Sequence, residues 1–431
     1  MAHPDLTNHD LADPDIVVVG GGMVGLASGL ALLERGLSVA LVDPGEARAR
    51  TSYGNAGVLS RGSIFPMAGP ALWPKLPAYL RNADSALRVN HAHLFRVVPW
   101  GLHFLAAARE ARWRRAAAAL LPLTTAAYPA HERLAERAGT RARLRRSGWL
   151  KLYRTEAAFA GAALERMILA EHGVALELVD GAALRDLEPA LVRPYARAML
   201  LPETAALAEP GALVEACERL FTETGGRYLR GAVTALAPEA GGWRVIHAGG
   251  SLRARQVVVA AGAASAEILR PLGYRFAFAA ERGYHRHYAL HPDSPPLTRP
   301  VLDTGAGSIL APMGERRVRV LSGVELNARH AAPDHRQIEA AAREAAGTLR
   351  LGGPLDNQPW MGSRPSTPDG MPVIGRAPRH DGLILAFGHG HIGLSTGPIT
   401  GQLVADLATG TEPSVPLAPF APDRLLRWPH L

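Results

Sequence analysis

The stretch from Asp15 to Asp43 reads DIVVVGGGMVGLASGLALLERGLSVALVD. A hydrophobic run, Ile16 to Val19, precedes three glycines with the spacing G-x-G-x-x-G. A segment rich in small residues then leads to a second apolar run that ends at Asp43. This order predicts a strand, a tight turn, a helix and a second strand with an acid at its end. We therefore expect an α/β fold organised around this unit.

Each glycine of the motif has its own mechanical reason. Gly20 makes the turn off the strand, Gly22 lets the backbone approach a pyrophosphate, and Gly25 lets the helix pack close to the sheet. The helix N-terminus, which includes Met23 and Val24, would offer its backbone N–H groups to the phosphates. Asp43, followed by Pro44, suits an unphosphorylated ribose and disfavours NADP. The alternative is a glycine-rich turn in an ordinary α/β unit, and the motif does not choose between FAD and NAD.

Composition excludes several classes of protein. The chain has 431 residues, a formal net charge of +8, and two lysines, Lys75 and Lys151, among many arginines. Such a length predicts two connected domains. The basic balance could favour acidic substrates, nucleic acid or an anionic membrane. The arginine clusters lie in Ala-rich, apparently helical stretches, however, and no basic stripe is interleaved with aromatic residues. We therefore expect solvated helix faces and no nucleic-acid partner.

A single cysteine, Cys217, cannot form an intrachain disulfide or a zinc cluster, and its helical surroundings predict a core position. We expect no metal site. The first fourteen residues lack the basic and apolar regions of a signal peptide, and the sequence has no run of eighteen apolar residues. A cytoplasmic protein is therefore expected.

Two later segments repeat the opening order of strand, glycine turn and helix. The first is QVVVAAGAAS, from 256 to 265, and the second runs from Gly382 to Gly410, with its helix expected at 398–407. The chain thus returns to the nucleotide domain from its middle and its end. The predicted fold is a Rossmann-type domain with an inserted α+β domain on a large mixed sheet. The first domain is expected at 14–60, 203–275 and 366–420, and the second at 61–202 and 276–365.

Four motifs, together with Arg282-Gly283-Tyr284, resemble the FAD-dependent D-amino-acid oxidase and dehydrogenase family, and in particular its bacterial D-amino-acid dehydrogenase branch. They are the opening glycine motif, Thr51-Ser52-Tyr53-Gly54-Asn55-Ala56-Gly57, Ser363-Arg364-Pro365 with Thr367-Pro368-Asp369-Gly370, and Gly388-His389-Gly390 with Gly393-Leu394-Ser395. The resemblance covers most of the chain. It implies non-covalent FAD and oxidation of an amino acid by hydride transfer from Cα to flavin N5. The imino acid would then hydrolyse to a 2-oxo acid.

The resemblance also implies site residues. Arg364 is the expected clamp for the substrate carboxylate, because a guanidinium can donate two parallel bonds; a structural ion pair with Asp369 is the alternative. Polar groups expected near the pocket are Tyr53, Tyr284, His287 and His389, as positioning groups more than as bases. Further residues expected to bind FAD are Ser52, Asn55, Ala56, Gly57, Val233, Ala261, Gly262, Gly388, Gly390, His391, Ile392, Gly393, Leu394 and Ser395.

One departure from the family leaves the substrate open. The strand Ser308 to Pro312 lacks the tyrosine that helps to hold the carboxylate in D-amino-acid oxidases. Tyr53 or Tyr284 could replace it, or Arg364 could act alone. The alternatives are therefore a dehydrogenase of D-hydroxyproline, proline, sarcosine or glycine, and an oxidase that uses O2. Dehydrogenases of this branch pass electrons to a quinone, so the expectation includes a quinone or another carrier, and leaves open peripheral contact with the inner face of the cell membrane.

Two other readings of the sequence are weaker. The segment 393–397 fits the G-x-S-x-G of α/β-hydrolases, but the 36 residues after Ser395 are too few for the rest of that fold. A partner role in tRNA modification would need a nucleic-acid module that the sequence does not contain.

Overall fold

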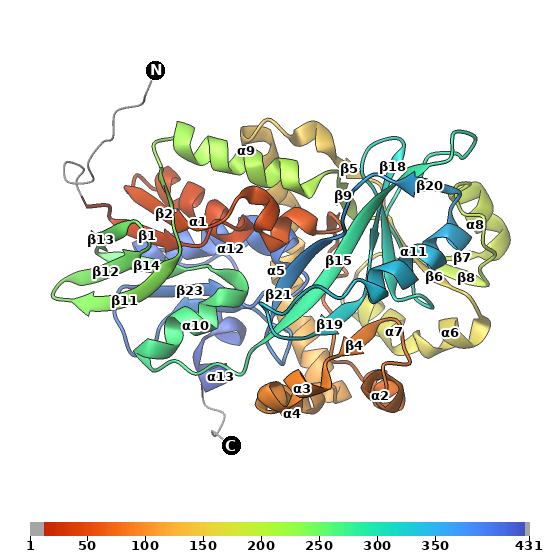
Figure 1. The fold of residues 1–431 in the computed structure, drawn as a ribbon, viewed down its shortest axis with the longest axis horizontal. Coiled ribbons are helices and arrows are strands. Elements are labelled where there is room, and N and C mark those ends of the chain that lie inside the picture. Colours follow the sequence, from red (N-terminus) through yellow and green to blue (C-terminus); the bar gives the residue numbers. More distant parts are fainter. Residues whose placement is uncertain (1–12, 427–431) are drawn as a thin grey trace.

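The computed structural model describes residues 13–426, which form two large sheets side by side (Figure 1). The sheet on the left of the view contains the opening glycine motif. The sheet on the right is built around the long strand β15 (Ala279–Leu290). This arrangement confirms the predicted fold class of a Rossmann-type domain joined to a domain with a large mixed sheet.

The first sheet has six strands in the order β10-β2-β1-β14-β23-β22. All pairs are parallel except β22 with β23. The strand order reverses between β1 and β14, and the glycine turn lies at this topological switch point. Ligands of doubly wound sheets bind there, at the carboxyl ends of the strands. The strands are β1 (Ile16–Val19), β2 (Val39–Asp43), β10 (Arg227–Arg230), β14 (Gln256–Val259), β22 (Val373–Arg376) and β23 (Leu383–Phe387).

Both faces of this sheet are covered, which explains the continuous apolar runs of its strands. Val18 packs toward α1 (Met23–Glu34), α9 (Pro210–Glu223) and α12 (Gly393–Thr409). Val17 packs toward a three-stranded antiparallel sheet on the other side. Cys217 on α9 is fully buried in the first of these cores, as predicted. The small sheet consists of β11 (Val233–Glu239), β12 (Gly242–His247) and β13 (Gly250–Ala254).

The second large sheet has eleven strands, of which nine follow the order β4-β19-β15-β18-β17-β16-β6-β8-β7. Two further strands, β20 and β21, pair with β15. The helix α11 (Arg336–Thr348) packs on one face. The strands are β4 (Leu87–Val89), β6 (Trp149–Tyr153), β7 (Glu177–Asp180), β8 (Arg197–Leu201), β16 (Val301–Asp303), β17 (Ser308–Pro312), β18 (Arg317–Leu321), β19 (Val324–Leu326), β20 (Leu351–Pro354) and β21 (Trp360–Ser366).

The remaining elements connect and cover these sheets. A third small sheet contains β3 (Val58–Leu59), β5 (Leu144–Arg146) and β9 (Ala205–Leu207). The other helices are α2 (Leu72–Leu80), α3 (His91–Leu94), α4 (Val98–Ala107), α5 (Glu110–Arg137), α6 (Glu156–Gly161), α7 (Ala163–Glu171), α8 (Gly181–Leu187), α10 (Ser265–Leu269) and α13 (Asp423–Leu426). Among the helices of residues 13–426, none has the length and hydropathy to cross a bilayer.

The predicted helix 398–407 is too short. The helix α12 begins at Gly393 and contains Pro398. Pro398 lacks an N–H group, so the carbonyl of Leu394 loses its usual donor four residues on. The ring Nε2 of His131 on α5, 2.8 Å from that oxygen, takes its place. A side chain from another helix therefore completes the first turns of α12. The predicted domain limits place α5 in one domain and α12 in the other, so this contact would join the two domains. The limits themselves stay a prediction.

Candidate active site

The glycine motif forms a tight junction between β1, β14 and α1. A Cβ atom on Gly20, which has φ of +109°, would lie 2.5 Å from the carbonyl oxygen of Ala260. A Cβ atom on Gly25 would lie 1.8 Å from the carbonyl oxygen of Gly20. At Gly22, in contrast, the nearest atom to such a Cβ is Ser52 Oγ at 3.9 Å. Two glycines are therefore required by packing, and the third leaves space beside the start of α1.

Asp43 ends β2 beside this space. Its carboxylate accepts hydrogen bonds from the backbone N–H of Gly21 at 2.7 Å and of Gly45 at 3.0 Å. Arg50 and Tyr228 surround the same carboxylate, with Arg50 Nε 3.4 Å from Oδ1 and Tyr228 Oη 3.5 Å from it. Neither residue belongs to a recognisable motif, so neither could be predicted from the sequence. Together they define the end of the groove where the acid at the end of β2 would meet a ribose.

Two further glycines border open space along the same edge of the sheet. Gly262, after β14, and Gly390, before α12, have positive φ, and a Cβ atom on either would have no described atom within 4 Å. The N-cap residue of α12, Ile392, makes no side-chain hydrogen bond to the helix within the described chain. The free N–H groups of such a helix end attract anions and developing negative charge. These three positions, with Gly22, fit a dinucleotide laid along the carboxyl ends of the strands.

The loop Thr51–Gly57 connects this groove to the large sheet. Thr51 Oγ1 donates to the Ser363 carbonyl of β21 at 2.8 Å, and Trp360 Nε1 donates to the Arg48 carbonyl at 2.8 Å. Asn55 bridges the two predicted cofactor segments, because its Oδ1 accepts from Gly57 N–H at 2.9 Å and its Nδ2 donates to the His391 carbonyl at 3.4 Å.

Arg319 on β18 forms hydrogen bonds to the backbone of the same loop. Its Nη1 donates to the carbonyl oxygens of Asn55 at 2.6 Å and of Tyr53 at 3.3 Å. Its Nε donates to His287 Nε2 at 3.0 Å, and the other ring nitrogen of His287 lies 2.8 Å from a carboxylate oxygen of Asp356. Burial lowers the pKa of Arg319 to about 10. The chain Asp356–His287–Arg319 therefore supports the loop that carries Asn55.

Arg364 lies on β21 beside Ser363, whose carbonyl binds Thr51 of this loop, and we expect the substrate pocket at this place. It pairs in register with Glu281 of β15, so both side chains share one face. Gly283 makes room for it, since a Cβ atom there would lie 2.5 Å from Arg364 Nη1. That Nη1 atom is buried, and within residues 13–426 it has no hydrogen-bond partner. Burial lowers the pKa of Arg364, and the charge of Glu281 opposes that shift.

Glu281 moderates the positive charge of Arg364. It is 4% exposed, and its Oε1 accepts a hydrogen bond of 2.7 Å from Ser366. Burial raises its pKa, against the hydrogen bond from Ser366 and the charge of Arg364. The alternative pairing of Arg364 with Asp369 is excluded, because Asp369 pairs with Arg424 at 2.9 Å.

His391 and Lys151 complete the charged part of this face. The side chain of His391 is exposed, and desolvation by the surrounding protein, together with the nearby cations Arg364 and Lys151, lowers its pKa to about 4. Lys151, on β6, is 8% exposed and pairs with Glu165. The register across β6, β16, β17 and β18 puts Lys151, Ile309 and Leu321 on the same face. His391 was predicted from the sequence, whereas Lys151 and Glu281 belong to no motif and were not.

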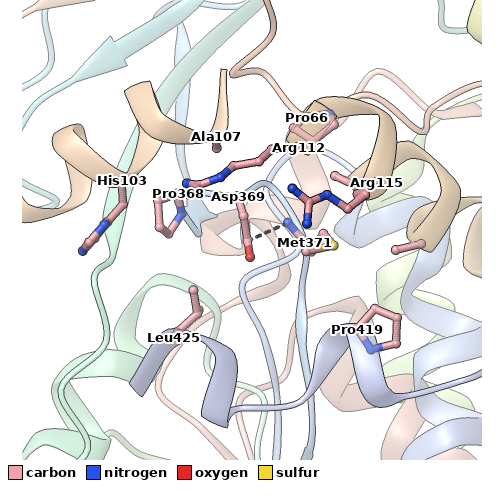
Figure 2. A pocket seen from close by; sticks show the side chains of 12 residues that line it. Pro66, His103, Ala107, Arg112, Arg115, Pro368, Asp369, Met371, Pro419 and Leu425 are labelled. Atoms are coloured by element: carbon pink, nitrogen blue, oxygen red, sulfur yellow. Dashed lines mark hydrogen bonds between the residues drawn. The ribbon is translucent and has the colours of Figure 1, made fainter. Parts of the chain in front are cut away.

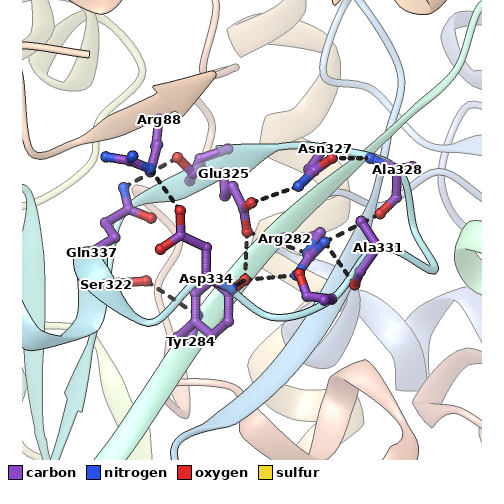
Figure 3. A network of polar contacts seen from close by, with 12 residues as sticks. Arg88, Arg282, Tyr284, Ser322, Glu325, Asn327, Ala328, Ala331, Asp334 and Gln337 are labelled. Carbon is purple, nitrogen blue, oxygen red and sulfur yellow. Dashed lines mark hydrogen bonds and ion pairs between the residues drawn. The ribbon is translucent and has the colours of Figure 1, made fainter. Parts of the chain in front are cut away.

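The prediction that Tyr284 lies near the substrate pocket is wrong. Successive residues of a strand point to opposite faces, so Tyr284 faces α11 while Glu281 and His285 face the loop. Its hydroxyl binds Glu325 at 2.5 Å, Arg282 at 2.8 Å and the Asp334 N–H at 3.0 Å (Figure 3). Burial raises its pKa to about 12. Tyr284 therefore belongs to a closed structural network.

The other predicted polar groups have positioning roles. His389 is 2% exposed, its Nε2 lies 3.1 Å from Thr400 Oγ1 on α12, and burial lowers its pKa to about 3. A catalytic role for its ring is therefore not supported. The ring of Tyr53 packs against Gly211 at the start of α9, where a Cβ atom on Gly211 would lie 2.4 Å from Tyr53 Cε2. The described residues hold no group of three or more His, Cys, Asp or Glu side chains arranged for a metal ion.

The remaining predicted residues lie around the groove. Met23 N–H donates to Ser52 Oγ at 3.2 Å, and Ser395 Oγ donates to the Ile392 carbonyl at 2.8 Å. Val233 begins β11, Ala261 follows β14, and Pro44 follows β2. Val24 is in the first turn of α1, Ala56 and Gly57 precede β3, and Gly388 follows β23 with φ of +80°. Contact of all these residues with a cofactor remains a prediction.

Comparisons with known proteins agree with this geometry. Residues 15–407 match the family model of FAD dependent oxidoreductases. The chain is similar to D-amino-acid oxidase of Bradyrhizobium diazoefficiens, with 32% identity over 95% of this chain and 99% of that protein. It is similar to D-amino acid dehydrogenase 2 of Ralstonia nicotianae, with 32% identity over 94% of this chain and 99% of that protein.

A solved structure shares the fold. Glycine oxidase from Geobacillus kaustophilus superposes with a TM-score of 0.77 at 23% identity, over 97% of this chain and 99% of that one. The groove along the first sheet, with open space beside Gly22, Gly262 and Gly390, fits FAD. By the family model and by its similarity over nearly the full length of these relatives, this chain belongs to the FAD dependent oxidoreductase family.

Proposed function

We propose that this protein oxidises a D-amino acid to an imino acid, which water then hydrolyses to a 2-oxo acid and ammonia. The observation that carries this proposal is the buried Arg364 Nη1 atom, which has no hydrogen-bond partner in the part of the chain that the structure describes. A buried donor of a charged group is costly unless a ligand satisfies it. A substrate carboxylate would do so with two parallel hydrogen bonds. The names of the D-amino-acid oxidase and dehydrogenase relatives support the same substrate class.

The residues of the pocket have separable tasks. When bound, FAD supplies the acceptor for the hydride that leaves Cα. Arg364 holds the carboxylate and so fixes the position of Cα. His391 stays neutral, since its pKa is lowered to about 4. It can therefore accept a hydrogen bond from the substrate amine without adding a positive charge near Arg364. The apolar residues Ile309 and Leu321 on the same face would contact the substrate side chain.

The cofactor is proposed to be bound without a covalent link to cysteine. The thiol of Cys217 is fully buried in the core beside α1, and burial raises its pKa to about 12. Such a thiol is neither accessible nor nucleophilic. Acid precipitation of the purified protein should release all yellow colour into the supernatant, and flavin that remains in the pellet would contradict this part of the proposal.

The electron acceptor is proposed to be a quinone or another carrier rather than O2, with peripheral contact to a membrane. The support is the name of the dehydrogenase relatives. A cyclic or N-substituted substrate is the second candidate. It is favoured by β17, where Ile309 lies on the pocket face and no tyrosine adds a second donor for the carboxylate.

One experiment tests the substrate and the acceptor together. Turnover is measured for D- and L-amino acids, glycine, sarcosine and the hydroxyproline isomers, once with an artificial electron acceptor and once with O2. The proposal expects the highest kcat/KM with a D-amino acid and the artificial acceptor. Highest activity with sarcosine or a hydroxyproline would favour the second candidate. Turnover confined to compounds without a carboxylate would refute both.

A further inference from the structure

More than half of the large apolar side chains that are exposed among the described residues come from one segment of the chain. Of the eleven large hydrophobic residues that are exposed among the described residues, six lie between 67 and 102. Phe95, in a 3-10 turn directly before α4, is 80% exposed, and Val98 and Leu102, four residues apart on α4, are exposed on one face of that helix. The other three are Met67, Trp73 and Leu80. We call the part of the surface that carries these six residues, on and beside α2, α3 and α4, the α2–α4 surface.

The inner sides of these helices have their own packing partners. Leu72 of α2 packs with Ala107 and Phe104 of α4, and Trp100 stacks on Phe104 with ring centroids 4.7 Å apart. The exposed residues are therefore the outer face of a packed layer. In Figure 1, α2, α3 and α4 lie together at the lower edge of the molecule, away from the α1 and α9 side.

The charge around this surface selects an anionic partner. Residues 67–115 contain eight Lys or Arg residues and two acidic residues. Lys75, Arg81, Arg96 and Arg109 are exposed beside the apolar side chains. A second copy of the chain would bring like charges together, which disfavours self-association. A bilayer with anionic lipids attracts such cations and accepts protruding aromatic side chains without a shaped groove.

A cavity beside the surface offers a place for a lipid headgroup. Its volume is about 410 Å³, and Arg112 and Arg115 of α5 point into it from one side (Figure 2). It is lined by Pro66 and His103, the direct neighbours of the exposed Met67 and Leu102. Asp369 also lines it, with its carboxylate paired to Arg424. Two guanidinium groups beside an apolar wall suit the phosphate and the glycerol region of a lipid.

We propose that the α2–α4 surface docks this protein on an anionic phospholipid bilayer. Phe95, Val98 and Leu102 enter the apolar region, and Arg112 and Arg115 meet the phosphates. This inference rests on the membrane contact proposed above and gives it a location. The segment after β21 connects the surface to the pocket, because Pro368 and Asp369 follow Arg364 by only a few residues and line the cavity.

Vesicle flotation tests the proposal without any substrate. The holoenzyme is mixed with vesicles of phosphatidylcholine alone, or of phosphatidylcholine with phosphatidylglycerol. We expect binding to the anionic vesicles, and a loss of about tenfold in the double variant Phe95→Ser with Leu102→Ser. Arg112→Gln with Arg115→Gln should weaken binding and its dependence on salt. The matched control is Leu178→Ser with Leu355→Ser, which removes apolar side chains that are 55% and 54% exposed elsewhere.

The outcomes separate this inference from the proposed function. Absence of flotation by the unmodified protein, or equal flotation of the Phe95 and Leu102 variant, overturns it. A dimer in light scattering that this variant converts to a monomer would also overturn it, by showing that the face joins two copies. Turnover with a soluble acceptor should be the same in this variant as in the unmodified enzyme, so a failure of the catalytic proposal would be seen independently of lipid.

Discussion

Arg282 and Arg364 lie on opposite faces of the paired strands β15 and β21, and their surroundings differ. Arg282 of β15 is fully buried and donates to Tyr284 Oη at 2.8 Å, to the Ala332 carbonyl at 2.9 Å and to the Ala331 carbonyl at 3.0 Å. It also lies 3.3 Å from Glu325. Arg364 of β21 has a buried Nη1 atom without a partner among residues 13–426.

The difference separates a structural cation from a binding one. Arg282 Nε also has no hydrogen-bond partner among the described residues, but it faces Glu325, and the other guanidinium nitrogens donate to several oxygens. A buried cation paired in this way stabilises the arrangement around it, whereas a buried donor with neither a hydrogen bond nor a carboxylate ion pair costs free energy until a ligand arrives. The Arg282 network joins β15, β19 and the segment before α11 (Figure 3). Arg364 faces the loop of Asn55 and the neutral His391. Replacing Arg364 should therefore lower catalytic activity more than stability, and replacing Arg282 should lower stability more than catalytic activity.

The largest expected effect is that of Arg364→Ala on catalysis. Loss of a bidentate charged contact should lower kcat/KM by about a thousandfold, or about 4 kcal/mol. Arg364→Lys should recover only part of this, because an ammonium cannot donate two parallel bonds in one plane. FAD content should not fall and the melting temperature should fall little, because Glu281, whose charge Arg364 compensates, keeps its hydrogen bond from Ser366. Steady-state kinetics with an artificial acceptor, together with the flavin spectrum, test this prediction.

The second effect concerns stability. Arg282→Met should lower the free energy of unfolding by about 3 kcal/mol, because Glu325 and the carbonyls of Ala331 and Ala332 lose their donor inside the protein. Turnover per flavin in the folded fraction should stay close to that of the unmodified enzyme. Denaturant unfolding of both arginine variants is the matched measurement. Equal destabilisation by Arg364→Ala would remove the distinction between the two faces.

These two arginines also show what the sequence could not decide. The glycine motif and Asp43 lie within thirty residues, so their turn, packing and acid can be predicted from local spacing. Arg364 was found through a motif. Glu281 and Lys151 reach the pocket through pairings of β15 with β21 and of β6 with β16, which join residues far apart in the chain.

The misplacement of Tyr284 has the same origin. Alternation predicts that Tyr284 and His285 point to opposite faces, but it does not say which face meets the cofactor domain. Both faces of β15 are buried and both carry polar residues, so burial pattern gives no preference. The start of α12 was missed because Pro398 reads as a first-turn residue, and its compensation by His131 comes from a helix more than two hundred residues earlier.

The third prediction probes the support of the Asn55 loop. Arg319→Met should weaken FAD binding about tenfold, because the carbonyls of Tyr53 and Asn55 lose their donor and the loop is no longer fixed. Flavin fluorescence on dilution measures the dissociation constant. His287→Gln retains an acceptor for Arg319 Nε and serves as the conservative control. Unchanged FAD affinity and unchanged KM in Arg319→Met would show that the loop does not depend on this contact.

A smaller effect is expected at the start of α12. His131→Phe should cost about 1 kcal/mol of stability, because it leaves the Leu394 carbonyl without a donor. Pro398→Ala supplies a backbone N–H four residues on and should reduce that cost in the double variant. Urea unfolding of the four proteins of this cycle gives the coupling energy. Strictly additive effects would mean that His131 does not replace the missing helix bond.

The smallest effect is a change in pH dependence. Burial lowers the pKa of His131 from 6.5 to about 4, so the folded protein favours its neutral ring. The stability this group contributes is fully present above pH 6.5 and is lost as the pH falls through 4. His131→Gln cannot take up this proton. The melting temperature should therefore fall less between these two pH values in the variant, and a parallel fall would contradict the assignment.

The central claim is that Arg364 recognises the carboxylate of the substrate. The most direct measurement compares one D-amino acid with its amide, in the unmodified enzyme and in Arg364→Ala. The unmodified enzyme should prefer the acid by roughly a thousandfold in kcat/KM, and the variant should lose nearly all of this preference while its activity on the amide changes little. If the variant still prefers the acid by the same factor, another group binds the carboxylate and this account of the pocket is wrong.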